Sequence, residues 1–176
     1  MKLETKNSRE DWLTFALDVL IKKGPEHLKI TPLCELKGVT KGSFYHHFKN
    51  RQAFLEAILA FWEEKFTQQF ISISQEGLNQ QEKMERLHQL VIESYGTYEV
   101  NIRAWAQVDP LARSYQERVD QQRLNFLYQL QRDLYETDED ARAMAHLQYT
   151  TLIGSAQVMP ALSASDLEHM YRLLTQ

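Results

Sequence analysis

The stretch from Lys29 to Arg51, KITPLCELKGVTKGSFYHHFKNR, constrains the fold most, because it compresses two short helices and a tight turn into a few residues. Thr31 followed by Pro32 predicts a helix start, since Thr can cap free N–H groups and Pro tolerates the first helical position. Gly38 is expected to end this helix, because glycine readily takes a positive φ. Thr40 is expected to cap a second helix two residues later. Two short helices joined by a glycine-containing turn form a helix-turn-helix pattern.

Apolar residues at helical spacing give each of these helices one buried side. Leu33 and Leu36, three apart, are expected to form the buried face of the first helix. Phe44 and Phe48, four apart, are expected to hold down the second helix. At about 100° per residue, His46 lies almost opposite the two Phe rings. The second helix therefore turns a polar face outward.

Residue types on this outer face suit a DNA groove. Ser43 and His46 can exchange hydrogen bonds with base edges, and Tyr45 beside them can reach a phosphate or a base. Lysine and arginine side chains around the face suit phosphates. The predicted DNA-binding set is Thr31, Thr40, Lys41, Gly42, Ser43, Tyr45, His46, His47, Lys49 and Arg51. The alternative at this point is a short solvated helix in an ordinary helical bundle.

The segment from Val39 to Leu59, VTKGSFYHHFKNRQAFLEAIL, resembles the signature of the TetR family of bacterial transcriptional regulators. The marked positions of that signature are filled here by Gly38, Val39, Thr40, Gly42, Tyr45, His47 and Phe48. Arg51 stands where the family usually has Lys. One departure concerns Lys29, where many members place a capping Thr or Ser. Residues 102–110 and 118–127, IRAWAQVDP and RVDQQRLNFL, resemble the regulatory half of some members more weakly.

Composition predicts an all-α fold for the 176 residues, because Pro and Gly are few and no alternating Val, Ile or Thr run marks a strand. With the resemblance, we expect a helix-turn-helix DNA-binding domain at 1–49, its motif at about 29–48, and a helical ligand-binding and dimerisation domain at 50–176. Residues 1–62 contain ten Lys or Arg and seven Asp or Glu, and residues 63–176 contain ten Lys or Arg and seventeen Asp or Glu. The net charge of −4 thus divides into +3 and −7, which suits a DNA-binding head on an acidic body.

A long helix is expected to join the two parts. Asn50 can cap it, and Phe54, Ile58, Phe61, Trp62, Phe66 and Phe70 would continue one apolar stripe along it. A change in the body that tilts such a helix would move the helix-turn-helix with it. The sequence therefore predicts a mechanical connection between body and head.

The resemblance implies a homodimer. Family members usually build a four-helix interface from their last two helices, which correspond here to residues of about 139–159 and 165–175. The first of these has a side of small or polar residues that would let a helix approach closely: Ala141, Ala145, Gln148, Leu152, Ser155 and Ala156. Two heads roughly 34–36 Å apart would read a two-fold symmetric double-stranded operator.

The resemblance also implies a small-molecule effector in the body. The candidate pocket residues are aromatic side chains on body helices: Tyr95, Tyr98, Trp105, Tyr115, Phe126 and Tyr149. Each could instead belong to the ordinary core. No charged body residue stands isolated among apolar neighbours, so the sequence does not reveal the charge of an effector.

Sequence patterns of metal sites and of enzymes are missing. His46 and His47 diverge by about 100° around a helix, so they are not expected to chelate one metal. There is no GxSxG, HExxH or glycine-rich phosphate loop, so we expect neither catalysis nor a cofactor. Cys34 is the single cysteine, and neither a secretory segment nor a membrane-length apolar run is present, so a cytoplasmic chain without membrane contact is expected.

These observations favour a homodimeric repressor that a small molecule releases from DNA. Two alternatives stay open. The same fold could act without an effector, as a constitutive or protein-controlled regulator. A helical enzyme or a protein-interaction module is the other alternative.

Overall fold

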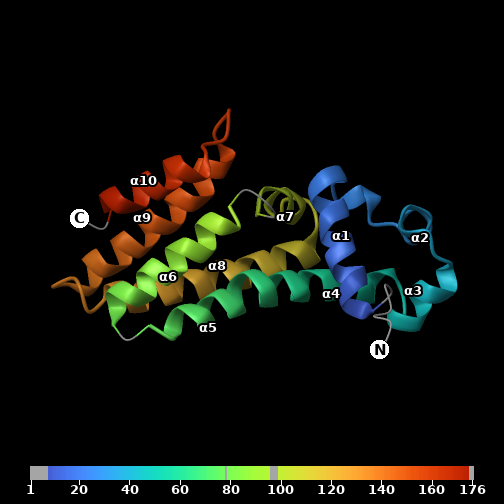
Figure 1. Ribbon diagram of the computed structural model, residues 1–176, viewed down its shortest axis with the longest axis horizontal. Helices are drawn as coiled ribbons and strands as arrows, with labels where there is room; N and C mark the ends of the chain where they lie inside the picture. Colours follow the sequence, from blue (N-terminus) through green and yellow to red (C-terminus); the bar gives the residue numbers. More distant parts are fainter. Residues whose placement is uncertain (1–7, 78, 96–98, 175–176) are drawn as a thin grey trace, which may run out of the picture. The chain divides into compact units, whose positions relative to one another are not determined.

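The computed structural model describes residues 8–77, 79–95 and 99–174, and all regular structure in this part of the chain is helical (Figure 1). The all-α prediction is confirmed. Residue contacts divide the chain into two compact units, Met1–Glu63 with Asn101–Tyr115 and Glu64–Val100 with Gln116–Gln176. The first unit thus extends past residue 49 and includes a later segment. The division of function at residue 49 stays a prediction.

The first unit contains the predicted helix-turn-helix. Its elements in chain order are α1 Arg9–Lys23, the short 3-10 helix Pro25–His27, α2 Ile30–Lys37, α3 Lys41–His47 and α4 Arg51–Glu63. A capping box begins α1, because Ser8 Oγ accepts from the Asp11 N–H at 3.0 Å and the Asp11 carboxylate accepts from the Ser8 N–H at 2.9 Å.

Phe44 forms the centre of this unit. Its ring is fully buried, with its centroid 5.5 Å from Trp12 on α1, 5.3 Å from Phe48 and 5.1 Å from Phe54 on α4. Most of these pairs meet edge to face, the geometry that aromatic quadrupoles favour. The predicted inward side of α3, Phe44 and Phe48, is confirmed.

The start of α2 differs from the prediction. The helix begins at Ile30, and the extended residue before it is Lys29 rather than Thr31. Pro32 is then the third residue of the helix, a position that tolerates proline because the first four N–H groups have no partner within the helix. Thr31 lies in the first turn and provides no cap.

The buried face of α2 is also different from the expected one. Leu33 is buried, but Leu36 is 52% exposed, and Cys34 is the second buried residue of the helix. The helix is only two turns long. Which residues beside Leu33 are buried therefore depends on how the helix is oriented against the rest of the unit, and not on the three-residue spacing alone.

A π-helical segment interrupts the long connecting helix. Residues Glu64–Gln68 form this segment between α4 and α5 Gln69–Gln75, and the second compact unit begins at the same residue, Glu64. A π turn holds an extra residue, so the buried side rotates. Thr67 within this segment and Ser74 beyond it are buried, while Phe66 and Phe70 are only half-buried. The predicted single apolar stripe is wrong there.

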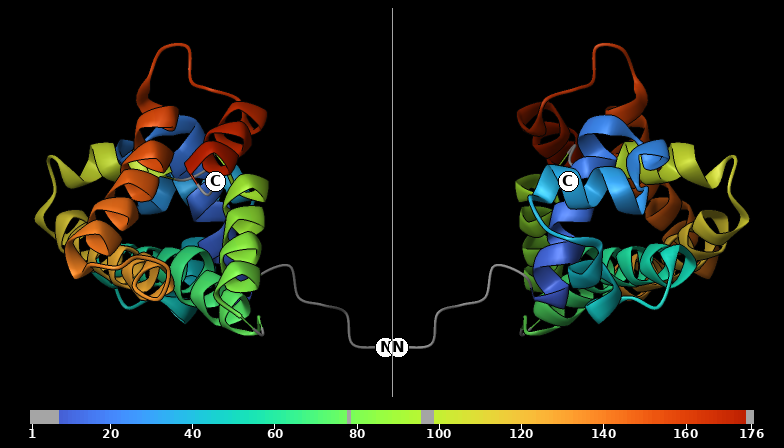
Figure 2. Two further views of the ribbon diagram at one scale, coloured as in Figure 1. Left: turned by 90° about the vertical axis from the view of Figure 1, so that its left-hand side faces the viewer. Right: turned by 90° about the vertical axis from the view of Figure 1, so that its right-hand side faces the viewer.

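The second unit contains α5 and the later helices. These are α6 Gln80–Glu93, α9 Asp138–Gln157 and α10 Ala164–Leu174, with parts of α7 Glu99–Ala106 and α8 Pro110–Gln131. Within it α6 packs against α5 and α10, and α10 packs against α9 (Figures 1 and 2). The core cluster of this unit consists of Met84, Phe126, Leu127, Leu130, Ala145 and Tyr149.

Replacing Phe44 by Ala should lower the free energy of unfolding by about 3–5 kcal/mol, because it removes a fully buried ring and leaves a cavity. Replacing Leu36 by Ala should change it by less than about 0.5 kcal/mol, because most of that side chain is exposed. Urea unfolding followed by circular dichroism measures both. An equal decrease in the free energy of unfolding in the two variants would contradict the burial of Phe44 and the exposure of Leu36.

Candidate functional site

The turn between α2 and α3 depends on Gly38. Its φ of 71° and ψ of 35° lie in the left-handed region, and its N–H donates to the Glu35 carbonyl at 3.1 Å. The Val39 N–H donates to the Cys34 carbonyl at 2.9 Å, which completes the C-terminal cap. The predicted glycine stop is confirmed, and it sets the direction in which α3 leaves the turn.

The outer face of α3 is open to solvent. Tyr45 is 54% exposed, Lys41 and His46 are exposed, and Ser43 and His47 are partly buried. These side chains project from a helix whose opposite side is held by the buried Phe cluster. The geometry leaves their polar groups available to a partner, and contact with DNA stays a prediction.

Thr31 and Thr40 both lie at helix starts without capping them. Thr40 is the residue before α3, as predicted, but its hydroxyl makes no capping hydrogen bond, and Lys29 before α2 has no capping side chain either. Both threonines are exposed. Contact of either threonine with DNA stays a prediction.

Arg51 has a structural role that the sequence did not reveal. Its Nε donates to the Leu28 carbonyl at 3.0 Å, which connects the start of α4 to the residues before α2. Asn50 caps α4 as predicted, because its Oδ1 accepts from the Ala53 N–H at 2.8 Å. Arg51 thus positions the helix-turn-helix, whatever it also contributes to phosphate binding.

Two further cations lie on the aromatic cluster of the first unit. The Arg9 guanidinium lies 5.5 Å from the centroid of Phe48, and the Lys37 ammonium lies 5.4 Å from Trp12 and 5.0 Å from Phe15. Sequence reasoning did not select either residue, because only the packing of α1 beside the motif brings them there. Arg9 is a cation near the end of α3 that the predicted set lacks.

His46 and His47 are closer than their helical separation suggests. Their ring centroids lie 4.8 Å apart and meet edge to face. In the part of the chain that the structure describes, no three His, Cys, Asp or Glu side chains come together in a way that could hold a metal ion. No described helix is long and apolar enough to cross a bilayer.

The predicted effector residues do not fall in one unit. Trp105 and Tyr115 belong to the first unit, whereas Tyr95, Phe126 and Tyr149 belong to the second. Phe126 and Tyr149 are members of the core cluster. Tyr98 lies outside the described residues. A role of these side chains in ligand binding stays a prediction.

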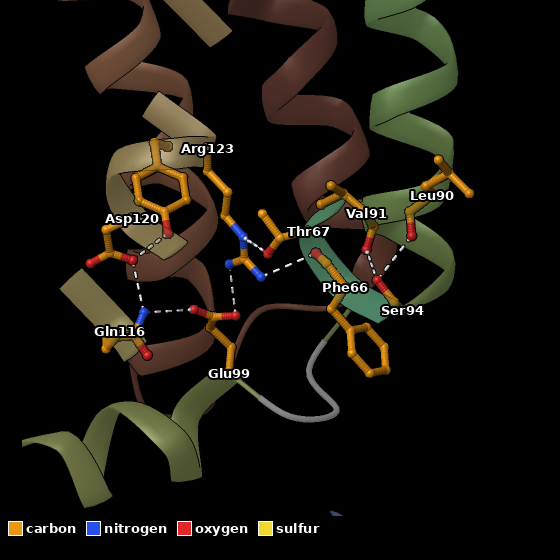
Figure 3. A network of polar contacts seen from close by, with 10 residues as sticks. Phe66, Thr67, Leu90, Val91, Ser94, Glu99, Gln116, Asp120 and Arg123 are labelled. Carbon is orange, nitrogen blue, oxygen red and sulfur yellow. Dashed lines mark hydrogen bonds and ion pairs between the residues drawn. The ribbon is translucent and has the colours of Figure 1, made fainter. Parts of the chain in front are cut away.

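A buried polar network occupies the second unit, centred on Arg123 of α8 (Figure 3). Its guanidinium pairs with Glu99 at 2.9 Å, and donates to the Thr67 hydroxyl at 3.0 Å and to the Phe66 carbonyl at 3.2 Å. Burial by itself would lower the pKa of Arg123, but Glu99 beside it raises that pKa above its usual value. The sequence alone does not select Arg123, because the residues that pair with it, Glu99, Thr67 and Phe66, are distant in the chain.

Asp120 extends this network. Its Oδ1 accepts from the Tyr149 hydroxyl at 2.6 Å and from Gln116 Nε2 at 2.7 Å (Figure 3). Gln116 Nε2 also lies 3.5 Å from the Glu99 carboxylate. Tyr149, one of the predicted effector residues, is therefore part of a buried hydrogen-bond network as well as of the core.

His88 of α6 and Tyr171 of α10 stack on each other, with centroids 4.2 Å apart and planes 11° from parallel. Burial lowers the pKa of His88 to about 4. The imidazole is therefore neutral at physiological pH. Burial raises the pKa of Tyr171 above its usual value, and the nearby hydroxyls of Tyr149 and Tyr95 raise it further.

A family model and several solved structures match this chain, and both comparisons lead to transcriptional regulators. The family model described as "Bacterial regulatory proteins, tetR family" matches residues 13–58. A comparison with curated protein sequences gives no match. The chain is similar in structure to a transcriptional regulator of the TetR/AcrR family, with a TM-score of 0.77 at 18% identity over 94% of this chain and 97% of the other.

Two further solved structures are similar over nearly their whole length. The reduced form of NemR from E. coli has a TM-score of 0.74 at 21% identity, covering 92% of each chain. A transcriptional regulator from Saccharomonospora viridis, solved in complex with choline, has a TM-score of 0.75 at 15% identity over 95% of this chain and 93% of the other. At these identities the similarity demonstrates a shared fold.

The free energy of unfolding should fall as the pH is lowered from about 6.5 to about 4, because the unfolded chain binds a proton on His88 that the folded chain excludes. The contribution is at most about 3 kcal/mol. In His88→Phe, which keeps a ring against Tyr171, this part of the loss should disappear. Urea unfolding at several pH values measures it, and an unchanged pH dependence in the variant would refute the assignment.

Proposed function

We propose that this chain, which belongs to the TetR family of bacterial regulatory proteins, binds a two-fold symmetric DNA operator as a homodimer and leaves it when a small molecule binds the second unit. The observation that carries the proposal is the outer face of α3. It presents Tyr45 and His46 to solvent within the segment that the family model matches. A recognition helix needs such a face, and the buried Phe44 keeps it in one orientation.

Charge supports the same function. Lys41 and Lys49 are exposed at the two ends of α3, and they belong to the part of the sequence with a net charge of +3. Cations that flank a polar face can neutralise phosphates while that face reads bases. The acidic remainder of the sequence would not add non-specific affinity for DNA.

The outer face of α9 supports dimerisation. Leu147 is 46% exposed, Val158 at the helix end is 47% exposed, and Gly154 lies on the same side at helical spacing. A side chain added at Gly154 would meet no atom within 4 Å. Exposed apolar residues around a glycine suit a second helix that approaches closely, and Leu173 of α10 is also 57% exposed.

The small-residue side of α9 faces the core of its own chain, and not a second chain as the sequence had suggested. Ala141, Ala145, Gln148 and Ser155 are buried within their own chain, and Ala145 belongs to the core cluster of the second unit. The proposed contact with a second chain therefore uses the opposite side of the same helix, Leu147 and Gly154. The helices of the proposed interface, about 139–159 and 165–175, stay the same.

Release by a small molecule is supported by the position of the π-helical segment. Glu64 begins both this segment and the second unit, and Arg123 holds the segment through Phe66 and Thr67. π-helical turns are frequent at functional sites. The S. viridis regulator of the same fold was solved with choline, which supports a small-molecule effector for this chain without identifying it.

Replacing Tyr45 and His46 together by Ala should abolish selective binding to the operator, while residual binding to any DNA stays, because base contacts specify and phosphate contacts position. Selection of bound genomic fragments provides the operator, and fluorescence anisotropy measures affinity for it and for competitor DNA. Gln89→Ala, at an exposed position of α6 outside α3 and outside the proposed dimer helices, is the control and should bind like the wild type. Retained selectivity in the double variant would refute the assignment of α3.

Replacing Lys41 or Lys49 by Ala should weaken binding to all DNA sequences alike and reduce the slope of log affinity against log salt by about 1 for each phosphate that the variant no longer neutralises. The same anisotropy titrations at several salt concentrations measure the slope. Lys83→Ala on α6 should leave it unchanged. A slope unaffected by Lys41 and Lys49 would show that neither lysine binds a phosphate.

Replacing Gly154 by Arg should raise the dimer dissociation constant at least about tenfold, because a long charged side chain would stand where the partner helix approaches. The isolated fold should tolerate it, since the position is open. Sedimentation velocity measures the dissociation constant. Gln89→Arg, at an exposed position of α6, adds the same side chain away from the proposed interface, and equal dimerisation in both variants would contradict the proposal.

A further inference from the structure

The chain crosses between its two compact units three times. The first unit therefore consists of two separate pieces of chain, residues 1–63 and residues 101–115. Residues 64–100 connect these pieces, include α5 and α6, and belong to the second unit. To assemble the first unit, the two ends of this connecting segment must be brought together, and closing such a loop costs conformational entropy.

One side chain of the second unit, Arg123, holds both ends of the connecting segment (Figure 3). Near the first end, its guanidinium donates to the Phe66 carbonyl at 3.2 Å and to the Thr67 hydroxyl at 3.0 Å. At the other end, it pairs with the Glu99 carboxylate at 2.9 Å. The side chains of this ion pair are only 13% and 19% exposed, so salt and water screen it little. A single guanidinium therefore joins the two ends.

The third crossing of the chain lies close to the same polar network. Gln116 is the first residue of the second unit after this crossing. Its Nε2 donates to Asp120 at 2.7 Å and lies 3.5 Å from the Glu99 carboxylate. Gln116, Asp120 and Arg123 all lie on α8, whose first residues belong to the first unit. The network thus includes a residue close to each of the three crossings.

α7 connects this ion pair to the first unit. Glu99 is the first residue of α7, and Asn101, two residues later, already belongs to the first unit. The Asn101 Nδ2 donates to the Ile21 carbonyl at 3.0 Å, in the last turn of α1, where carbonyls have no partner within the helix. Ile102 and Trp105 of α7 are buried. The helical turn that begins at Glu99 therefore ends in a hydrogen bond to α1.

α1 in turn supports α3, the helix that is proposed to read DNA. Trp12 of α1 contacts the fully buried Phe44 of α3, with ring centroids 5.5 Å apart. Because α1 is one continuous helix of 15 residues, a displacement of its last turn moves Trp12 with it. Hydrogen bonds, helical turns and ring contacts therefore extend without a gap from Arg123 to Phe44.

Resting on the proposed function, we infer that Arg123 is a positioning residue for DNA binding, because it joins the ends of residues 64–100 and so holds α7 where Asn101 supports α1. Breaking the Arg123–Glu99 pair releases the start of α7. The first unit then loses a support that only the folded second unit provides. A change in the second unit that separates these two charges therefore weakens operator binding. This connection through α7 is additional to the one through α4.

Unfolding in urea tests the coupling, because all three tryptophans of the chain, Trp12, Trp62 and Trp105, belong to the first unit. Tryptophan fluorescence therefore follows the first unit, whereas circular dichroism follows the helices of both units. Leu130→Ala destabilises the second unit, because Leu130 is buried in its core cluster. In the otherwise wild-type chain it should lower the urea midpoint of both signals. An unchanged fluorescence midpoint would overturn the inference, because the units would then unfold independently.

The same substitution is next made in a chain without the ion pair, Arg123→Met with Glu99→Leu. An apolar pair leaves no unpaired buried charge, so the second unit should stay folded. Leu130→Ala should still lower the midpoint of circular dichroism in this background, but it should leave the fluorescence midpoint unchanged. Asn101→Ala, which keeps the ion pair, is a second background and should reduce the fluorescence shift as well. Wild-type fluorescence shifts in both backgrounds would overturn the role of Arg123.

The matched control removes an exposed ion pair of the same unit. Arg86 and Glu76 lie 3.4 Å apart, with side chains 46% and 69% exposed. In the background of Arg86→Met with Glu76→Leu, Leu130→Ala should lower the midpoints of both signals, as in the wild type. A fluorescence midpoint that no longer responds in this control would overturn the specific role of Arg123, since the loss of any ion pair would then uncouple the units.

Operator affinity tests the link to DNA. The double variant of Arg123 and Glu99 and the single variant Asn101→Ala should each weaken operator binding at least about fivefold, the lower end of usual coupling between sites. Since both act through α7, the triple variant should bind no more weakly than the weaker of the two. Fluorescence anisotropy measures these affinities. Effects that multiply in the triple variant would overturn the connection through Asn101.

The unfolding experiment uses no DNA, so the two proposals can fail separately. If the wild type selects operator fragments but its fluorescence shift persists without the ion pair, the role of Arg123 alone is overturned. If the unfolding shifts are as expected but the wild type retains no DNA fragment over competitor, the proposed function is overturned and the coupling of the two units stands.

Discussion

The packing of Phe44 is the interaction on which the head depends. α3 is a helix of seven residues, too short to be stable in water by itself. Its orientation is determined by one fully buried ring that contacts Trp12 of α1 and Phe54 of α4. A recognition surface must hold its side chains in a constant geometry, and here the rigidity comes from the side of the helix that faces away from that surface.

The π-helical segment is the second constraint. It places Thr67 on the buried side and directs the Phe66 carbonyl to Arg123, whereas an uninterrupted α-helix would have continued the aromatic side inward. Arg123 in turn depends on Glu99, since a buried guanidinium without an anion is costly. The polar network of the second unit therefore exists because the regular helix is interrupted at Glu64.

Sequence reasoning succeeded where local chemistry decides the structure. The stop at Gly38, the cap at Asn50 and the inward side of α3 were all predicted and confirmed. It failed for Thr31 and Leu36, because proline is tolerated throughout the first turn and because a two-turn helix can be covered from several directions.

The sequence also does not show which of the predicted effector residues lie together in the folded chain. Aromatic side chains on body helices are easy to identify in a sequence, but Trp105 and Tyr149 belong to different compact units. Arg123 could not be selected, since its separation from water results from residues 24 and 56 positions away in the chain, Glu99 and Thr67. Only the folded chain brings these groups together.

The sequence by itself determined the all-helical class, the helix-turn-helix and the resemblance of that motif to the TetR signature, because caps, glycine turns and apolar spacing act over a few residues. The tertiary structure decided which side chains are buried beyond those short distances. In the folded chain Arg51 donates to the Leu28 carbonyl, the small-residue side of α9 packs into its own core, and Arg123 is largely buried. Burial and pairing depend on which helices meet, and that information is not contained in the spacing of any one helix.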